Sequence, residues 1–220
     1  HDPGLAMIEL HLYFAEVKLD LDASATLERA WQATERALEK HGDDYRLLAN
    51  RAQMRPARGK DPNPLAAALE DLLEAQSLQQ GDYTLELMEM GVRLMQAKAL
   101  TRSGDSAQEA FGDLRQRLDA ALEHWEPDGQ LYYYRASLAI LQISALGSRG
   151  EATVPYYESA LADLRAAIAG DREFQEATFL LLWLGFFLPP ELALDSAEVL
   201  ALEEGLRGAT PEGRLSGAWE

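Results

Sequence analysis

Cysteine is absent from this 220-residue sequence. Without cysteine the chain has no disulfide framework, no thiolate metal site and no cysteine nucleophile. The compartment stays open between cytoplasm and periplasm, because cysteine-free chains occur on both sides of a membrane. The chain begins with His1 instead of methionine, so we interpret it as a fragment of a larger protein.

Basic residues are scarce: 20 Lys and Arg stand against 37 Asp and Glu, and the formal net charge is −17. Non-specific binding to nucleic acids depends on Lys and Arg that neutralise phosphates, so we exclude nucleic acid as a main partner. Anionic membrane surfaces are excluded for the same reason. An acidic surface favours a basic protein or peptide as the partner.

Long apolar runs are also missing. The longest one, residues 178–188 (TFLLLWLGFFL), has about half of the roughly 20 residues that a membrane-spanning helix needs. It predicts a buried core helix, and we expect no membrane insertion within this segment. With 47% apolar residues the chain is long enough to bury a core, as one domain or one stack of repeats.

Motifs for catalysis or cofactor binding are lacking as well. Each of the four histidines stands alone, outside the spacings that place two metal ligands on one helix face. The pair Gly59-Lys60 is followed by Asp61 and lacks the upstream glycine of a phosphate-binding loop. Two carboxylates could in principle act as acid and base in a helical hydrolase, but solvated helix faces explain most acidic residues. We therefore expect a protein that is not an enzyme and holds no metal and no cofactor.

What the chain does contain is an internal repeat. Four segments, 27–38, 65–76, 111–122 and 157–168, place small or apolar residues at spacings of three and four, which predicts amphipathic helices. An aligned alanine recurs at intervals of about 40 residues, which predicts a repeating helix pair. These alanines are Ala37, Ala75, Ala121 and Ala167.

Polar turns with Gly and Asp follow each of these segments, at 41–44, 80–82, 127–129 and 170–171. Gly ends a helix by adopting a left-handed conformation, and Asp caps the helix that follows. The turns therefore agree with the periodicity in placing helix ends.

We predict an all-α fold, a right-handed α-solenoid of stacked antiparallel helix pairs in which neighbouring pairs bury a shared core. One repeat domain is expected over residues 1–208, followed by a flexible tail over 209–220. About ten helices are expected, at 4–19, 24–41, 44–57, 64–79, 83–102, 106–124, 129–147, 154–169, 173–188 and 195–207.

Residues 157–174 (YESALADLRAAIAGDREF) resemble the second helix and turn of a tetratricopeptide repeat (TPR), with Ala160, Leu164 and Ala167 at the family's small, bulky and alanine positions. The resemblance covers nearly the whole chain to about residue 188. The first helices lack the family's usual tryptophan and glycine pattern, and the repeat spacing exceeds the family's roughly 34 residues. The linker 57–64 (ARGKDPNP) is similar to linkers in repeat regions attached to bacterial serine/threonine protein kinases.

In TPR-like stacks the first helix of each repeat lines a concave groove. The resemblance selects as groove residues Asn50, Gln53, Leu87, Met88, Tyr133, Tyr134 and Ser137. Tyr and Met suit such a surface, because Tyr combines area with a hydroxyl and Met adapts its shape. The family's lysine and asparagine clamp for a terminal carboxylate is missing. The alternative is that several of these side chains pack between neighbouring helices.

These observations favour a non-catalytic scaffold that binds an extended or helical segment of another protein in its groove. The first alternative is the regulatory or sensing repeat region of a larger signalling enzyme, such as a serine/threonine kinase. A second alternative, from a different class, is a small-molecule binder or helical hydrolase.

Overall fold

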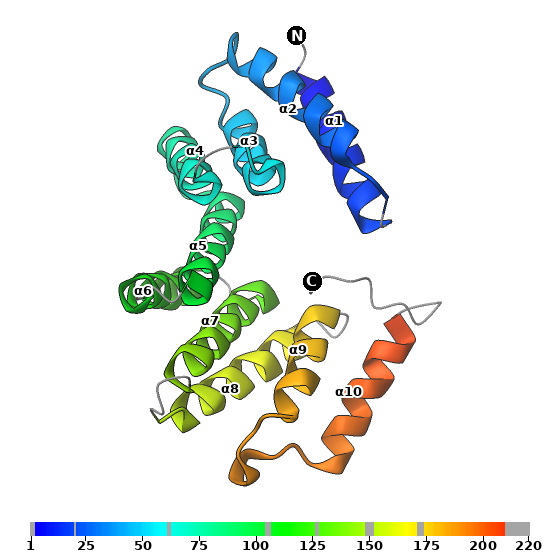
Figure 1. Ribbon diagram of the computed structural model, residues 1–220, viewed down its shortest axis with the longest axis vertical. Coiled ribbons are helices and arrows are strands. Elements are labelled where there is room, and N and C mark those ends of the chain that lie inside the picture. Colours follow the sequence, from blue (N-terminus) through cyan, green and yellow to red (C-terminus); the bar gives the residue numbers. More distant parts are fainter. Residues whose placement is uncertain are drawn as a thin grey trace. The chain divides into compact units, whose positions relative to one another are not determined.

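The computed structural model describes residues 3–19, 21–60, 63–103, 107–125, 128–147, 152–170 and 174–209. Within these ranges the chain forms ten α-helices, one short 3-10 helix at Pro190–Leu192 and no strand (Figure 1). The predicted all-α class is therefore confirmed. The helices are α1 (Pro3–Lys18), α2 (Ser24–Leu38), α3 (Tyr45–Arg58), α4 (Pro64–Leu78), α5 (Tyr83–Ser103), α6 (Gln108–His124), α7 (Gly129–Gly147), α8 (Val154–Gly170), α9 (Gln175–Gly185) and α10 (Ser196–Ala209).

Two helices end earlier than the sequence predicts. Helix α2 stops at Leu38, after which Lys40 N donates to Ala37 O over 3.1 Å, a bond to the residue three places back that is typical of a tighter turn. Helix α9 stops at Gly185, three residues before the predicted end at residue 188. Pro189 and Pro190 follow, and a residue before proline is disfavoured in the helical conformation. The other predicted ends lie close to the observed ones.

Aspartate caps begin three of the helices at the predicted polar turns. Each carboxylate accepts a hydrogen bond from a backbone N–H in the first turn, which satisfies a donor that has no partner inside the helix. Gly81, before α5, adopts the predicted left-handed conformation with φ of 70°. The bonds are Asp44 to Arg46 N at 3.0 Å, Asp82 to Thr84 N at 2.9 Å and Asp128 to Leu131 N at 3.0 Å.

The chain divides into two compact units. Unit 1 contains α1 to α4 and the part of α5 up to Arg93, and unit 2 begins at Leu94 and contains α6 to α10. The sequence predicted one repeat domain over 1–208 and a tail over 209–220. Ala209 is the last residue of α10, and the rest of the expected tail lies outside the described residues.

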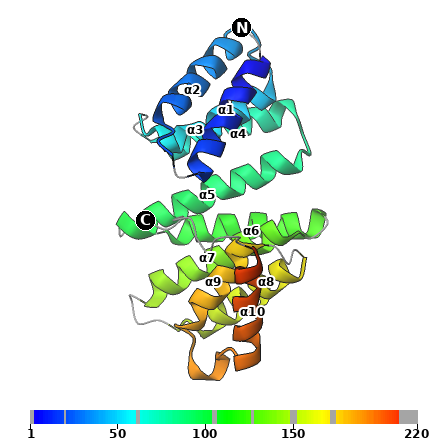
Figure 2. The ribbon, with the colours of Figure 1, turned by 90° about the vertical axis from the view of Figure 1, so that its right-hand side faces the viewer.

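In unit 1 each helix packs against its neighbours in the sequence, α1 on α2, α2 on α3 and α3 on α4 (Figures 1 and 2). The aligned alanines Ala37 and Ala75 are fully buried, so they allow the backbones of adjoining helices to approach closely. Leu85 and Val92 of α5 join the same core as Leu72 of α4. Unit 1 is thus a stack of helix pairs.

Unit 2 repeats this arrangement, with α6 on α7, α7 on α8, α8 on α9 and α9 on α10. Ala121 and Ala167 are buried at the positions that match Ala37 and Ala75. The longest apolar run, 178–188, contributes the core residues Leu181 and Leu184, as predicted for a buried helix. Both units therefore have the consecutive packed helix pairs of an α-solenoid.

No described helix combines enough length with enough hydropathy to cross a membrane. The predicted absence of a spanning segment agrees with this finding for the part of the chain that the structure describes.

Candidate functional site: the first-helix row and the ion pairs behind it

Contacts between side chains divide each unit into two layers. In unit 1 the amide Nδ2 of Asn50 on α3 donates to Sδ of Met7 on α1 over 2.8 Å, and Nε2 of Gln53 donates to Sδ of Met88 on α5 over 3.9 Å. We call the helices joined in this way, α1, α3 and α5 in unit 1 and α7 and α9 in unit 2, the first-helix row. The second-helix row is α2 and α4 in unit 1, and α6, α8 and α10 in unit 2.

The four predicted groove residues of unit 1 differ in exposure. Asn50 is only 5% exposed, so its amide serves the contact between α1 and α3. Gln53, Leu87 and Met88 are half-buried and present part of their surface to solvent. The structure thus brings Gln53 and Met88 into direct contact and buries Asn50 between α1 and α3.

In unit 2 the three predicted groove residues lie together on α7. The ring of Tyr133 lies 5.2 Å from the ring of Phe174, the residue before α9, and 6.2 Å from the ring of Tyr134, measured between centroids. Burial raises the pKa of the Tyr133 phenol, although a hydrogen bond with Ser137 partly lowers it. Burial likewise raises the pKa of Tyr134. Both phenols are therefore neutral groups at physiological pH.

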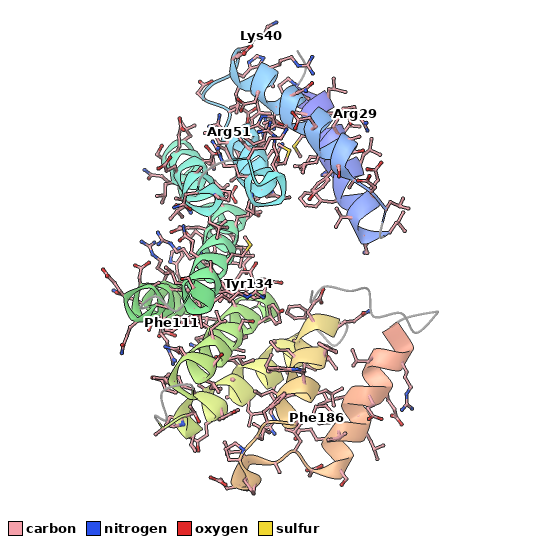
Figure 3. The ribbon with its side chains drawn as sticks, in the orientation of Figure 1. Arg29, Lys40, Arg51, Phe111, Tyr134 and Phe186 are labelled. Atoms are coloured by element: carbon pink, nitrogen blue, oxygen red, sulfur yellow. The ribbon has the colours of Figure 1, made fainter. Side chains whose placement is uncertain are left out.

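Helices α3 and α7 present matching residues to the same surroundings. Arg51-Ala52 on α3 corresponds to Arg135-Ala136 on α7, and both alanines are almost fully buried. In this register Asn50 corresponds to Tyr134 and Gln53 to Ser137. Two of the predicted groove positions on α3 are therefore equivalent to two on α7. Figure 3 marks Arg51 on α3 and Tyr134 on α7.

Behind the first-helix row of unit 1 lies an ion-pair node that the sequence interpretation missed. Arg51 donates from Nη2 and Nε to the carboxylate of Asp71 on α4, at 2.7 and 3.1 Å, and from Nη1 to Glu35 on α2 at 3.3 Å. Arg55 also donates from Nε to Asp71, at 2.6 Å. The Asp71 side chain is only 4% exposed, so its charge is neutralised inside the helix stack.

Unit 2 contains the same node. Arg135 on α7 donates to both oxygens of Asp163 on α8, at 2.7 and 3.0 Å, and to Asp119 on α6 at 2.8 Å. The side chain of Asp163 is 5% exposed. These hydrogen bonds raise the pKa of the Arg135 guanidinium despite the opposing effect of burial. For Arg51 burial lowers the pKa, but the bonds to Asp71 and Glu35 outweigh it and the net direction is upward.

A sequence signal for the nodes exists in the aligned second helices. Residues 68–75 (ALEDLLEA) and 160–167 (ALADLRAA) share an aspartate next to the buried leucine. An acidic residue at this place beside a core position indicates a buried charge, which requires a cation on a neighbouring helix. Solvated helix faces were expected to explain most acidic residues, and Asp71 and Asp163 are buried exceptions.

Two hollows lie between a second helix and a first helix, one in each unit, and their linings share two equivalent positions, Glu28 with Gly112 and Arg58 with Gln142. The first has a volume of about 420 Å³ and is lined by Glu28, Trp31, Gln32, Glu35, Arg36 and Arg58. The second has a volume of about 220 Å³ and is lined by Gln108, Phe111, Gly112, Gln142, Leu146 and Tyr156. Neither hollow includes any of the seven predicted groove residues, so the assignment of those residues to a ligand stays a prediction.

An ion pair and a stacked guanidinium form part of the lining of the first hollow. Arg58 donates from Nε to Glu28 over 3.1 Å and lies over the ring of Trp31, with Cζ 4.1 Å from the ring centroid. Lys60 donates to the same carboxylate over 2.7 Å. The hydrogen bonds from Arg58 and Lys60 hold the pKa of the Glu28 carboxyl at about 2, below its ordinary value.

The described residues contain no group of three or more His, Asp or Glu placed to hold a metal ion. Neither a protein-family model nor a curated protein matches the sequence.

Proposed function

We propose that this chain is a non-catalytic scaffold that binds a peptide or protein segment along its first-helix row. The observation that carries the proposal is that α3 and α7 each combine a buried ion pair with partly exposed polar or aromatic side chains. One side of each helix is locked to the second-helix row by a buried ion pair. Other positions of the two helices present partly exposed groups, an amide on α3 and hydroxyl and aromatic groups on α7. A surface held rigidly from behind loses little conformational entropy when it binds.

The chemistry of this surface favours an extended or helical basic segment. Gln53 supplies an amide, Ser137 a hydroxyl, and Tyr133 and Tyr134 supply area with neutral phenols. Met88 can adapt its shape to different partners. The net charge of −17 attracts Lys and Arg on the partner. Recognition of the segment would then combine apolar contacts on the first-helix row with attraction between the acidic chain and basic residues of the partner.

A peptide-display selection against the whole chain tests the proposal. Selected peptides are assayed against Leu87→Glu, on the first-helix row, and Leu73→Glu, the same substitution at an exposed leucine of α4 in the second-helix row. We expect Leu87→Glu to weaken binding by about tenfold or more, with little change for Leu73→Glu. Equal effects of both variants, or the absence of any selected peptide, would contradict the proposal.

The second candidate is a regulatory repeat region of a larger signalling enzyme, such as a bacterial serine/threonine kinase. The linker 57–64 favours it through its resemblance to linkers in such repeat regions. Sequencing the natural gene upstream of Asp2 tests it. A kinase would show a glycine-rich loop and catalytic-loop motifs there, and a gene without them would remove this candidate.

A further inference from the structure

Helix α1 is apolar on two opposite sides. One side carries Ala6 and Leu10, which are buried against α2 and α3. The other side carries a stripe of exposed residues that, at 3.6 residues per turn, lies across the helix from Ala6 and Leu10. The stripe consists of Leu5, Ile8, Leu12, Ala15 and Leu19. A helix that is apolar all round is normally buried, so α1 has the pattern of an internal helix although one of its sides faces solvent.

The stripe has the spacing of a coiled-coil seam. Its residues follow one another at intervals of three, four, three and four, which are the a and d positions of a heptad repeat. The backbone stays helical to the end of the stripe, because Leu19 N donates to Ala15 O over 3.1 Å. Phe14 and Val17 are exposed as well but lie off the stripe. The free side of α1 therefore suits packing against another helix.

The last helix of unit 2 has a different outer side. Among the described side chains of α10, Leu200 is the one exposed large apolar residue, and Glu204 and Arg207 are exposed on the same helix. Terminal elements of a helix stack need a polar outer face for solubility. Helix α10 comes close to this condition and α1 does not, so the stripe on α1 predicts a partner.

We propose that this partner is a second copy of the chain, and that two α1 helices pack in parallel along their stripes. The charges at the edges of the stripe favour this occupant. Glu9 and Glu16 lie along one edge, at e positions, and His11 and Lys18 lie along the other, at g positions. In a parallel pair the e edge of one helix faces the g edge of the other. Each acidic edge then meets Lys18 and the donor His11, whereas an antiparallel pair would place Glu beside Glu.

The groups at the acidic edge differ in how far they are already engaged. Glu9 is paired with Arg29 of α2 at 3.1 Å. Oε2 of Glu16 has no hydrogen-bond partner within the described part of the chain, and the heptad register brings His11 of the second copy to this residue. The net charge of −17 makes two copies repel at a distance, but at physiological ionic strength exposed charges more than about 8 Å apart are largely screened. Contact between the stripes therefore decides association.

The pair is expected to be weak. Helix α1 has 16 residues, about 24 Å of helix, which places the contact in the class of small interfaces below about 1,200 Å². Because α1 is already ordered by its packing on α2 and α3, association requires little further ordering. We expect a dissociation constant on the order of 100 µM. Leu at a with Ile at d also suits larger assemblies of free helices, but α1 carries its own unit on the opposite side, which favours two copies.

Sedimentation velocity of the whole chain over a concentration series tests the association. We expect a shift from monomer to dimer as the concentration rises. Leu12→Glu, at the centre of the stripe, should raise the dissociation constant about tenfold or more. Leu73→Glu is the matched control on α4, because Leu73 is 44% exposed and Leu12 is 48% exposed, and it should leave the constant unchanged. Circular dichroism establishes that both variants are folded.

A monomer at every concentration would overturn the proposal and leave the stripe to a helix of another protein. Equal effects of Leu12→Glu and Leu73→Glu, or a trimer or tetramer, would overturn it as well. The proposal does not rest on peptide binding by the first-helix row, since Leu87→Glu should leave the dimer unchanged. Failure of the dimer and failure of the proposed function are therefore distinguishable.

Single cysteines test the orientation, because the chain has no cysteine of its own. In a parallel pair position 5 meets position 5 of the second copy, and position 19 meets position 19. Leu5→Cys alone and Leu19→Cys alone should therefore each form a disulfide-linked dimer on mild oxidation, measured by non-reducing gel electrophoresis. A disulfide that forms only when the two variants are mixed would show an antiparallel pair and overturn the parallel arrangement.

Discussion

Asp71 in unit 1 is held by two guanidinium groups, whereas the equivalent Asp163 in unit 2 is bonded, among the described residues, by Arg135. The second cation of unit 1 is Arg55, one turn after Arg51 on α3. Its counterpart on α7 is Ala139, which is 1% exposed and belongs to the apolar core of unit 2. The same repeated node is thus redundant in one unit and dependent on a single arginine in the other.

An outer ion pair between α2 and α3 also distinguishes the two units. In unit 1 it joins Glu28 and Arg58, while the equivalent positions in unit 2 hold Gly112 and Gln142. The outer pair therefore adds a link between α2 and α3 that unit 2 does not have at the equivalent positions. The aligned alanines are buried in both units, so the helix pairs keep their close spacing with or without the outer ion pair.

Arg135→Leu should have the largest effect, because it leaves Asp163 buried beside no cation that the structure describes. Removing one partner of a buried ion pair costs about 3–5 kcal/mol. Urea unfolding followed by circular dichroism measures the loss. The double variant Arg135→Leu/Asp163→Leu should recover most of it, because no charge is then left buried. A loss below about 1 kcal/mol for the single variant would show that water compensates Asp163.

Arg51→Leu should cost less, about 1–2 kcal/mol, because Arg55 remains bonded to Asp71. Adding Arg55→Leu should bring the total close to the loss caused by Arg135→Leu. The same unfolding assay provides the comparison. If Arg51→Leu alone lowers the free energy of unfolding as much as Arg135→Leu does, Arg55 does not replace Arg51 as the partner of Asp71. The proposed redundancy of the unit 1 node is then contradicted.

Transplanting the outer ion pair should stabilise unit 2 by a smaller amount. Gly112→Glu with Gln142→Arg recreates the Glu28–Arg58 pair. Replacing a helical glycine contributes about 0.5–1 kcal/mol by itself, so Gly112→Ala is the control. The pair should add about 0.2–1 kcal/mol beyond this control. A double variant no more stable than Gly112→Ala would indicate that the two units differ in backbone geometry at this place.

The smallest expected effect concerns the titration of Glu28 in unit 1. Its pKa of about 2 lies below the ordinary value of 4.5, because Arg58 and Lys60 bond the ionised form. The stabilising contribution is therefore complete above pH 4.5 and is lost as the pH falls toward 2. NMR titration of the carboxyl group measures the midpoint. Arg58→Leu should move this midpoint upward, and an unchanged midpoint would assign the shift to another group.

Local signals in the sequence sufficed to place most of the helix ends. The turn aspartates, Gly81 and the periodic apolar positions act within a few residues of the chain, so Asp44 and Asp82 could be placed as caps without knowledge of the fold. The buried alanines of the repeat were also predictable, because recurrence at one interval implies one recurring environment.

The candidate surface was predictable only in part. The sequence placed Asn50, Gln53, Tyr134 and Ser137 on equivalent first helices, but it could not distinguish Asn50, which is buried against Met7, from Gln53, which is partly exposed. Exposure depends on which neighbouring side chains cover a position, and those neighbours come from other helices. Whether these residues bind a ligand stays a prediction.

The sequence by itself determined that this chain forms about ten helices, where most of them begin and end, and which alanines of the repeat are buried. Only the tertiary structure decided which charges pair. Arg51 meets Asp71 across 20 residues and Arg135 meets Asp163 across 28. These partners are joined by the stacking of helices and not by a helical period, because a period of 3.6 residues relates only side chains on the same helix.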